Sequence, residues 1–218
     1  MADLGMADYR VGAGAHGKPY LIESDGNSSA PKAQKTDNTD MKNIFFNISH
    51  SGSMAVLALS GSEVGVDIEE VRHFKDNLVN YAFNDEETEL AAKMSACINI
   101  EKSSNSHSND EKNDPERKLD LAFTRLWTFK ESVMKYTGIG IAMGARNIRL
   151  RDSSSASDIT EVDSGSHPVR YRISNISASC DSFDLSGISF TEYFVQGYAL
   201  TVCSKCAPFC DEVKFTEV

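Results

Sequence analysis

The order of strand-like and helix-like segments along the chain most constrains its fold. The hydrophobic periodicity predicts strands over residues 44–70, helices over 78–94 and 119–137, with Gly138 as a helix-ending residue, and strands again over 169–173, 183–189 and 193–203. Strands followed by helices and then by strands are typical of an α+β fold.

Composition limits the classes of function that the chain can have. It has 218 residues, 40% of them hydrophobic, which is enough for one domain or for two packed halves. The formal charge of −10 disfavours nucleic-acid binding, which needs a basic surface. There is no apolar run of membrane-spanning length and no pattern typical of a signal peptide. We therefore expect a cytoplasmic protein that binds neither nucleic acid nor a membrane.

Three polar segments interrupt the structured blocks, at about residues 24–42, 95–118 and 152–168. Each is rich in Ser, Asn, Asp, Lys or Gly and poor in large apolar side chains. Ordering such a segment would bury too little surface to offset the lost chain entropy. We expect all three to be surface loops.

The segment Val64–Glu69 alternates between apolar and other residues, so Gly65, Asp67 and Glu69 share one face of a predicted strand. Carboxylates two residues apart on a strand have Cα atoms roughly 6.6 Å apart and can converge on one Mg²⁺ ion. Gly65 would leave room for a ligand to approach the backbone. Taken alone, however, the pair favours a solvent-exposed strand face, because such alternation is routine in antiparallel sheets.

The predicted helix around Trp127 is apolar on most sides, and Glu131 and Lys135 occupy the remaining strip. A carboxylate on a largely buried helix needs a partner or a metal. The alternative is an exposed Glu–Lys pair of little consequence. Earlier in the chain, Ser49 and His50 lie in a turn where they could donate hydrogen bonds to phosphate oxygens. A hydrolase is disfavoured, because no Gly-x-Ser-x-Gly turn surrounds the serine.

Taken in order, these clusters resemble the signature motifs of the Sfp-type 4′-phosphopantetheinyl transferases. The motifs that carry the resemblance are Gly17-Lys18-Pro19, Phe46–Gly52, Gly65–Glu69, Phe83–Glu87, Trp127–Lys135 and Gly197–Cys203. The resemblance covers roughly residues 17–207. It implies a pseudo-twofold α+β fold that holds coenzyme A at the seam between two halves, and transfer of phosphopantetheine to a serine of an acyl or peptidyl carrier protein.

The resemblance also implies roles for individual residues. Asp67, Glu69 and Glu131 would hold Mg²⁺ or Mn²⁺. Glu87 or Glu131 would take the proton from the incoming serine, and Lys135 would contact the pyrophosphate. The residues implied to contact coenzyme A are Lys18, Ser49, His50, Lys130 and Lys135.

The sequence departs from the family pattern at its start, because the Gly-Lys-Pro element begins at Gly17 rather than well inside the first half. We therefore expect a shortened N-terminal half over residues 1–70 and a C-terminal half over residues 71–218. Three explanations stay open: a fragment, a misplaced start, or a shortened enzyme that completes its site as a homodimer. An alternative is a truncated homologue that only binds coenzyme A or carrier proteins. A zinc site at Cys203, Cys206 and Cys210 is a third, less favoured interpretation.

Overall fold

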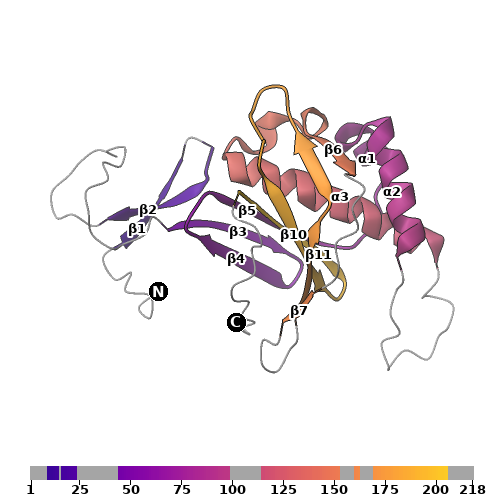
Figure 1. Ribbon diagram of the computed structural model, residues 1–218, viewed down its shortest axis with the longest axis horizontal. Helices are drawn as coiled ribbons and strands as arrows, with labels where there is room; N and C mark the ends of the chain where they lie inside the picture. Colours follow the sequence, from indigo (N-terminus) through magenta and orange to yellow (C-terminus); the bar gives the residue numbers. More distant parts are fainter. Residues whose placement is uncertain are drawn as a thin grey trace.

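The computed structural model describes residues 9–14, 16–23, 44–98, 114–152, 160–162 and 169–205 (Figure 1). The predicted loop at residues 24–42 lies outside these ranges, as does most of the predicted loops at 95–118 and 152–168. Within the described residues, no helix is both long enough and apolar enough to span a bilayer.

A five-stranded antiparallel sheet is the largest element of the fold. Its strands lie in the order β5 (Val64–Glu70), β11 (Tyr198–Ser204), β10 (Ser189–Val195), β8 (Val169–Ser174) and β7 (Thr160–Val162). The register pairs Asp67 of β5 with Thr201 of β11. Strand β5 thus comes from the first third of the chain and pairs with β11 from its last part. The division into halves at residue 70 stays a prediction.

The described residues form the helices α1 (Asp76–Ala82), α2 (Asp85–Cys97) and α3 (Pro115–Thr137). Helix α3 packs against β5 and β11, and α2 packs on α3 (Figure 1). Asn84 and Glu87 form a capping box that starts α2, and Gly138 ends α3 in the left-handed conformation with φ of 70°. The main core lies between α3 and the sheet, where Phe129 and Phe190 meet edge to face with ring centroids 4.9 Å apart.

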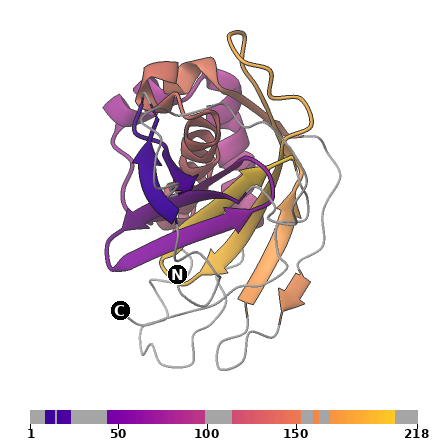
Figure 2. The same cartoon turned by 90° about the vertical axis from the view of Figure 1, so that its left-hand side faces the viewer.

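Two hairpins and a small two-stranded sheet complete the described structure. The hairpins are β1–β2 (Tyr9–Ala13, Pro19–Glu23) and β3–β4 (Phe45–Ser51, Met54–Ser60). The small sheet pairs β6 (Arg149–Asp152) with β9 (Ile176–Ser179), and the 3₁₀ turns η2 (Gly140–Met143) and η3 (Ala145–Asn147) precede β6. In Figure 2 both hairpins face the viewer, in front of the helices.

The α+β class predicted from the sequence is confirmed, but three segments differ from expectation. The strand predicted over 193–203 is parts of two strands, β10 and β11, because the chain turns at Gly197, which has φ of 79°. The helix predicted over residues 78–94 is two helices, because the chain is extended at Phe83 and Asn84 between α1 and α2. The strand predicted over 183–189 is wrong: the Asp184 carboxylate accepts a hydrogen bond from the Ser186 N–H at 2.9 Å, which forms a turn, and β10 begins only at Ser189.

Candidate active site

Strand β3 is joined to the free edge of β5 through its side chains. Alternate N–H groups of β5 donate to β3: Val66 to Asn47 at 3.2 Å, Ile68 to the Ser49 hydroxyl at 3.3 Å, and Glu70 to the Ser51 hydroxyl at 3.1 Å. The polar face of β3 is therefore buried, and its apolar neighbour Ile48 is exposed. This joint places the Ser49 hydroxyl directly beside the predicted metal strand.

Asp67 lies at the centre of the site and is only 2% exposed. Its Oδ1 accepts hydrogen bonds from the Ser49 hydroxyl at 2.8 Å and from the Lys135 ammonium at 2.6 Å. Its Oδ2 is buried and has no hydrogen-bond partner among the described residues. Burial raises the pKa of Asp67 to about 7, and the charge of Glu131 adds to this, although Lys135 opposes it.

Two further carboxylates lie near this site, those of Glu131 and Glu69. Glu131 lies on α3 one turn before Lys135, and its pKa is raised mainly by burial and also by the charge of Glu69, against the effect of Lys135. The Glu69 carboxylate accepts a hydrogen bond from the Ser51 hydroxyl at 3.0 Å. The structure thus brings the four predicted residues of β5 and α3 close enough for their charges to interact.

These carboxylates offer the hard oxygen ligands that Mg²⁺ prefers. The buried, unpartnered Oδ2 of Asp67 is an oxygen that a cation could satisfy. Within the part of the chain that the structure describes, however, no three His, Cys, Asp or Glu side chains are already gathered closely enough to hold a metal. The residues present fit a divalent cation in their chemistry, while the metal itself remains a proposal.

Gly65 has a different role from the one predicted. A Cβ at this position would lie 2.0 Å from the carbonyl oxygen of Ser132 and 2.6 Å from the backbone nitrogen of Tyr136. The space that the glycine leaves is therefore filled by the backbone of α3, and a ligand does not occupy it. This close approach of helix and strand is what places Lys135 against Asp67.

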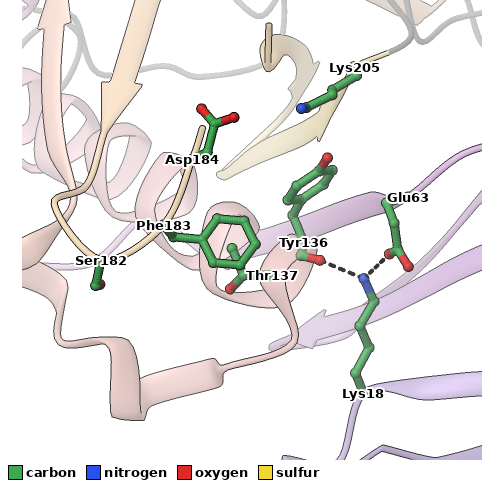
Figure 3. A pocket seen from close by; sticks show the side chains of 8 residues that line it. All are labelled: Lys18, Glu63, Tyr136, Thr137, Ser182, Phe183, Asp184 and Lys205. Carbon is green, nitrogen blue, oxygen red and sulfur yellow. Dashed lines mark hydrogen bonds and ion pairs between the residues drawn. The ribbon is translucent and has the colours of Figure 1, made fainter. Parts of the chain in front are cut away.

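Lys18 lies beyond the C-terminal end of α3, apart from the carboxylates. Its ammonium donates to the carbonyl oxygen of Tyr136 at 2.7 Å and forms an ion pair with Glu63 (Figure 3). A cavity of about 580 Å³ opens here, and Phe183 and Lys205 are among its lining residues. A contact between Lys18 and coenzyme A stays a prediction.

His50 is exposed, whereas its neighbour Ser49 is buried against Asp67. Successive side chains of a strand point to opposite faces, so the structure brings Ser49 to the carboxylates and leaves His50 on the outer face of β3. Its predicted contact with coenzyme A is untested.

Lys130 and Glu87 do not lie in the open site. Both side chains are 0% exposed, and they form an ion pair of 2.8 Å. Three carbonyl oxygens also accept from the Lys130 ammonium, those of Ala82, Ala145 and Ile148 at 2.8–3.0 Å, and burial lowers the pKa of Lys130. Their burial disfavours a direct contact with coenzyme A or with a serine of another protein. The roles that the resemblance implied for these two residues stay untested predictions.

The sequence did hold a signal for the burial of Lys130. When α3 is drawn as a helical wheel, Glu131 and Lys135 share the one polar strip, and Lys130 falls outside it among apolar neighbours. A lysine in that position needs a buried acceptor. The identity of the acceptor, Glu87 on α2, could not be read from spacing.

The zinc interpretation is not supported at Cys203, the one member of its cysteine set that is described. Cys203 is free and fully buried, and burial raises the pKa of its thiol to about 12, which disfavours the thiolate form that binds zinc. Cys206 and Cys210 lie outside the described residues.

Comparison with known proteins agrees with this geometry. A model of the 4′-phosphopantetheinyl transferase superfamily matches residues 63–203, which include β5, all three helices and the closing strands. The chain belongs to this superfamily, which confirms the family and the transferase class predicted from the sequence.

Individual relatives carry the same name. A 4′-phosphopantetheinyl transferase of Bacillus subtilis is 24% identical over 97% of this chain and 70% of its own length. A second Bacillus subtilis relative, 4′-phosphopantetheinyl transferase ffp, is 28% identical over 68% of this chain and 50% of its own length. The AcpT transferase of Salmonella typhi is 38% identical over 44% of this chain and 41% of its own. The chain thus spans 70% of one of these relatives and half or less of the other two.

Proposed function

We propose that this chain transfers 4′-phosphopantetheine from coenzyme A to a serine hydroxyl of an acyl or peptidyl carrier protein. The observation that carries the proposal is the meeting of Asp67 and Glu69 on β5 with Glu131 and Lys135 on α3, inside the region that matches the superfamily. The alternative of a protein that only binds its ligands is disfavoured, because all four of these side chains are present and adjacent.

The lysine and the serine at Asp67 form the part of the site suited to the diphosphate of coenzyme A. The Lys135 ammonium and the Ser49 hydroxyl lie 2.7 Å apart, and Lys135 is still about a quarter exposed. Both can donate hydrogen bonds to phosphate oxygens, and the ammonium would offset negative charge that moves onto the leaving oxygen.

In the transfer step, the serine Oγ forms a bond to the β-phosphorus of coenzyme A. The bond from this phosphorus to the bridging oxygen of the diphosphate breaks, and 3′,5′-ADP leaves with that oxygen. The serine proton passes to a carboxylate. Of the two acceptors implied by the resemblance, we retain Glu131, because Glu87 is sealed inside the protein.

Asp67, Glu69 and Glu131 are the residues that we propose to hold Mg²⁺, or Mn²⁺ in its place. A bound divalent cation would neutralise charge on the diphosphate. Burial is the main cause of the raised pKa values of Asp67 and Glu131, and repulsion between neighbouring carboxylates adds to it. A bound cation would relieve that repulsion.

The test is intact-mass spectrometry of an apo acyl carrier protein after incubation with this chain, coenzyme A and Mg²⁺. We expect the wild type to add one phosphopantetheine. Asp67→Ala should add none, and Glu89→Ala, which changes an exposed carboxylate on α2, should behave like the wild type. No mass gain with several carriers and a folded protein would refute the proposed activity. Gain with Asp67→Ala would refute the proposed site.

A cytoplasmic location and a homodimer belong to the same proposal. The first follows from the use of coenzyme A and carrier proteins as substrates. The second has a candidate surface in the apolar outer face of the β3–β4 hairpin, where Ile48, Leu57 and Leu59 are exposed. Both stay predictions.

A further inference from the structure

A second cavity adjoins the carboxylates on the side away from Lys135. It has a volume of about 440 Å³, and Glu69, Leu78 and Trp127 are among its lining residues. Along α3, Trp127 lies about two turns from Lys135, and Glu131 lies between them. If the diphosphate binds at Lys135, this cavity offers the second substrate an approach to the carboxylates at Glu69.

Helix α1 forms one wall of this cavity, and few contacts hold it. It has seven residues, of which Ala82 alone is buried. At its start, the N–H of Phe74 donates to the Asp120 carboxylate at 3.1 Å. Near its end, the exposed Arg146 donates to the carbonyl oxygen of Asn80 at 2.8 Å. A helix this short is not stable by itself, so its position depends on such anchors.

The strongest anchor of α1 is the ammonium of Lys130. The Lys130 side chain is 0% exposed. Its ammonium donates to the carbonyl oxygen of Ala82, the last residue of α1, at 2.8 Å. The same ammonium bonds the carbonyls of Ala145 and Ile148 and the carboxylate of Glu87. One cation on α3 thus ties together the end of α1, the start of α2 and the turn before β6.

We propose that Lys130 is a positioning residue for the carrier protein: through Ala82 it fixes the α1 wall of the cavity beside Glu69, where the serine-bearing segment docks. The proposal rests on the proposed function, because it assumes that a carrier protein is the second substrate. Lys130 touches neither substrate. Its removal should therefore weaken use of the carrier protein and leave the affinity for coenzyme A unchanged.

The test compares two variants that both lack the buried charge of Glu87. Glu87→Gln leaves the Lys130 ammonium without its counter-ion, which lowers stability, but it keeps the three carbonyl acceptors, so the contact with Ala82 remains. The double variant K130M/E87Q removes the anchor as well, and because it removes both charges together it leaves no buried ion without a partner. The glutamine retains an oxygen for the Leu150 N–H, which donates to Glu87 at 2.9 Å in the wild type.

Three measurements are made on each protein. Steady-state transfer to an apo acyl carrier protein of bacterial fatty-acid synthesis gives KM and kcat, and calorimetric titration gives the Kd for coenzyme A. Hydrogen exchange follows the amides of residues 80–83, where the Phe83 N–H donates to Val79 at 2.9 Å. For the double variant we expect a roughly tenfold higher carrier KM than for Glu87→Gln, an unchanged Kd, and faster exchange confined to α1 and residues 145–148.

Other outcomes would overturn the proposal. A tenfold weaker Kd for coenzyme A in the folded double variant would return Lys130 to the coenzyme A site. A carrier KM of the double variant equal to that of Glu87→Gln would show that Lys130 only stabilises the fold. If the double variant does not fold, exchange in the wild type decides, since unprotected amides at residues 80–83 would show that Lys130 does not hold α1. Absence of transfer by the wild type would refute the proposed function, while the exchange measurement would still test the anchor.

Discussion

At the scale of one residue, Asp67 shows how the candidate site lowers the free energy of unfolding. A buried carboxylate oxygen without a partner destabilises a protein by about 1–3 kcal/mol. The Oδ2 of Asp67 is such an atom within the described part of the chain, and the second carboxylate charge at Glu131 adds to the cost. A cation bound at this oxygen would recover that free energy. Metal binding and stability should therefore be linked through Asp67.

We expect Mg²⁺ to raise the melting temperature of the wild type, because a ligand that binds only the native state stabilises it by mass action. The Asp67→Asn variant should lose most of this rise, and Glu70→Gln, an exposed carboxylate on the same strand, should keep it. The measurement is thermal unfolding in EDTA and at increasing Mg²⁺. An equal rise in Asp67→Asn and in the wild type would place the cation elsewhere.

Which residues of the site the sequence could predict depends on what their placement requires. Asp67 and Glu69 share a strand face, and Glu131 and Lys135 share a helix strip, so two local periodicities were enough to group them. The pairing of Lys130 with Glu87 depends on which helix packs against α3. Residue spacing along a single helix or strand does not contain that information. The family resemblance grouped Lys130 and Glu87 with the site because it matches residue types and gives no information on which side chains are buried.

At the scale of elements, the site depends on how closely α3 approaches β5. Gly65 is the point of contact, and a side chain there would meet the helix backbone rather than a flexible neighbour. The strand pattern identified Gly65 as a place of close approach, but not what approaches it. An alternating pattern likewise does not say which face is inside, and so the burial of the polar face of β3 could not be foreseen.

Gly65→Ala should destabilise the protein by about 3 kcal/mol or more, because the added Cβ would lie 2.0 Å from the Ser132 carbonyl oxygen and must push α3 away from β5. Gly61→Ala is the matched control, since a Cβ there meets nothing within 4 Å. Urea unfolding of both variants measures the difference in the free energy of unfolding. Equal stability of the two would show that α3 does not pack this closely.

The joint between β3 and β5 makes a separate prediction. Asn47→Ala removes the acceptor of the Val66 N–H and should cost about 1–3 kcal/mol, because that buried N–H loses its partner. The Val66 amide should also exchange faster with solvent, as measured by NMR. Asn80→Ala, at an exposed position of α1, is the control and should leave both quantities unchanged. Unchanged exchange at Val66 in Asn47→Ala would contradict the side-chain joint.

At the scale of the whole molecule, the outer face of the β3–β4 hairpin is unusual for a chain of charge −10. The cross-strand pairs Phe46–Leu59, Ile48–Leu57 and His50–Ala55 share this face, and none of these residues is acidic. A second copy of the chain offers a face of the same composition, and its approach there would not bring acidic side chains together.

We therefore expect the isolated chain to be a dimer in light-scattering measurements after size-exclusion chromatography. Leu57→Glu, at a position 57% exposed, should give a folded monomer, because the carboxylate would have to be buried in the interface. Ile141→Glu, at a position 74% exposed on η2, should remain dimeric and so controls for the general effect of an added charge. A wild type that is monomeric at all concentrations would refute the dimer, and dissociation by both variants would place the interface outside the hairpin.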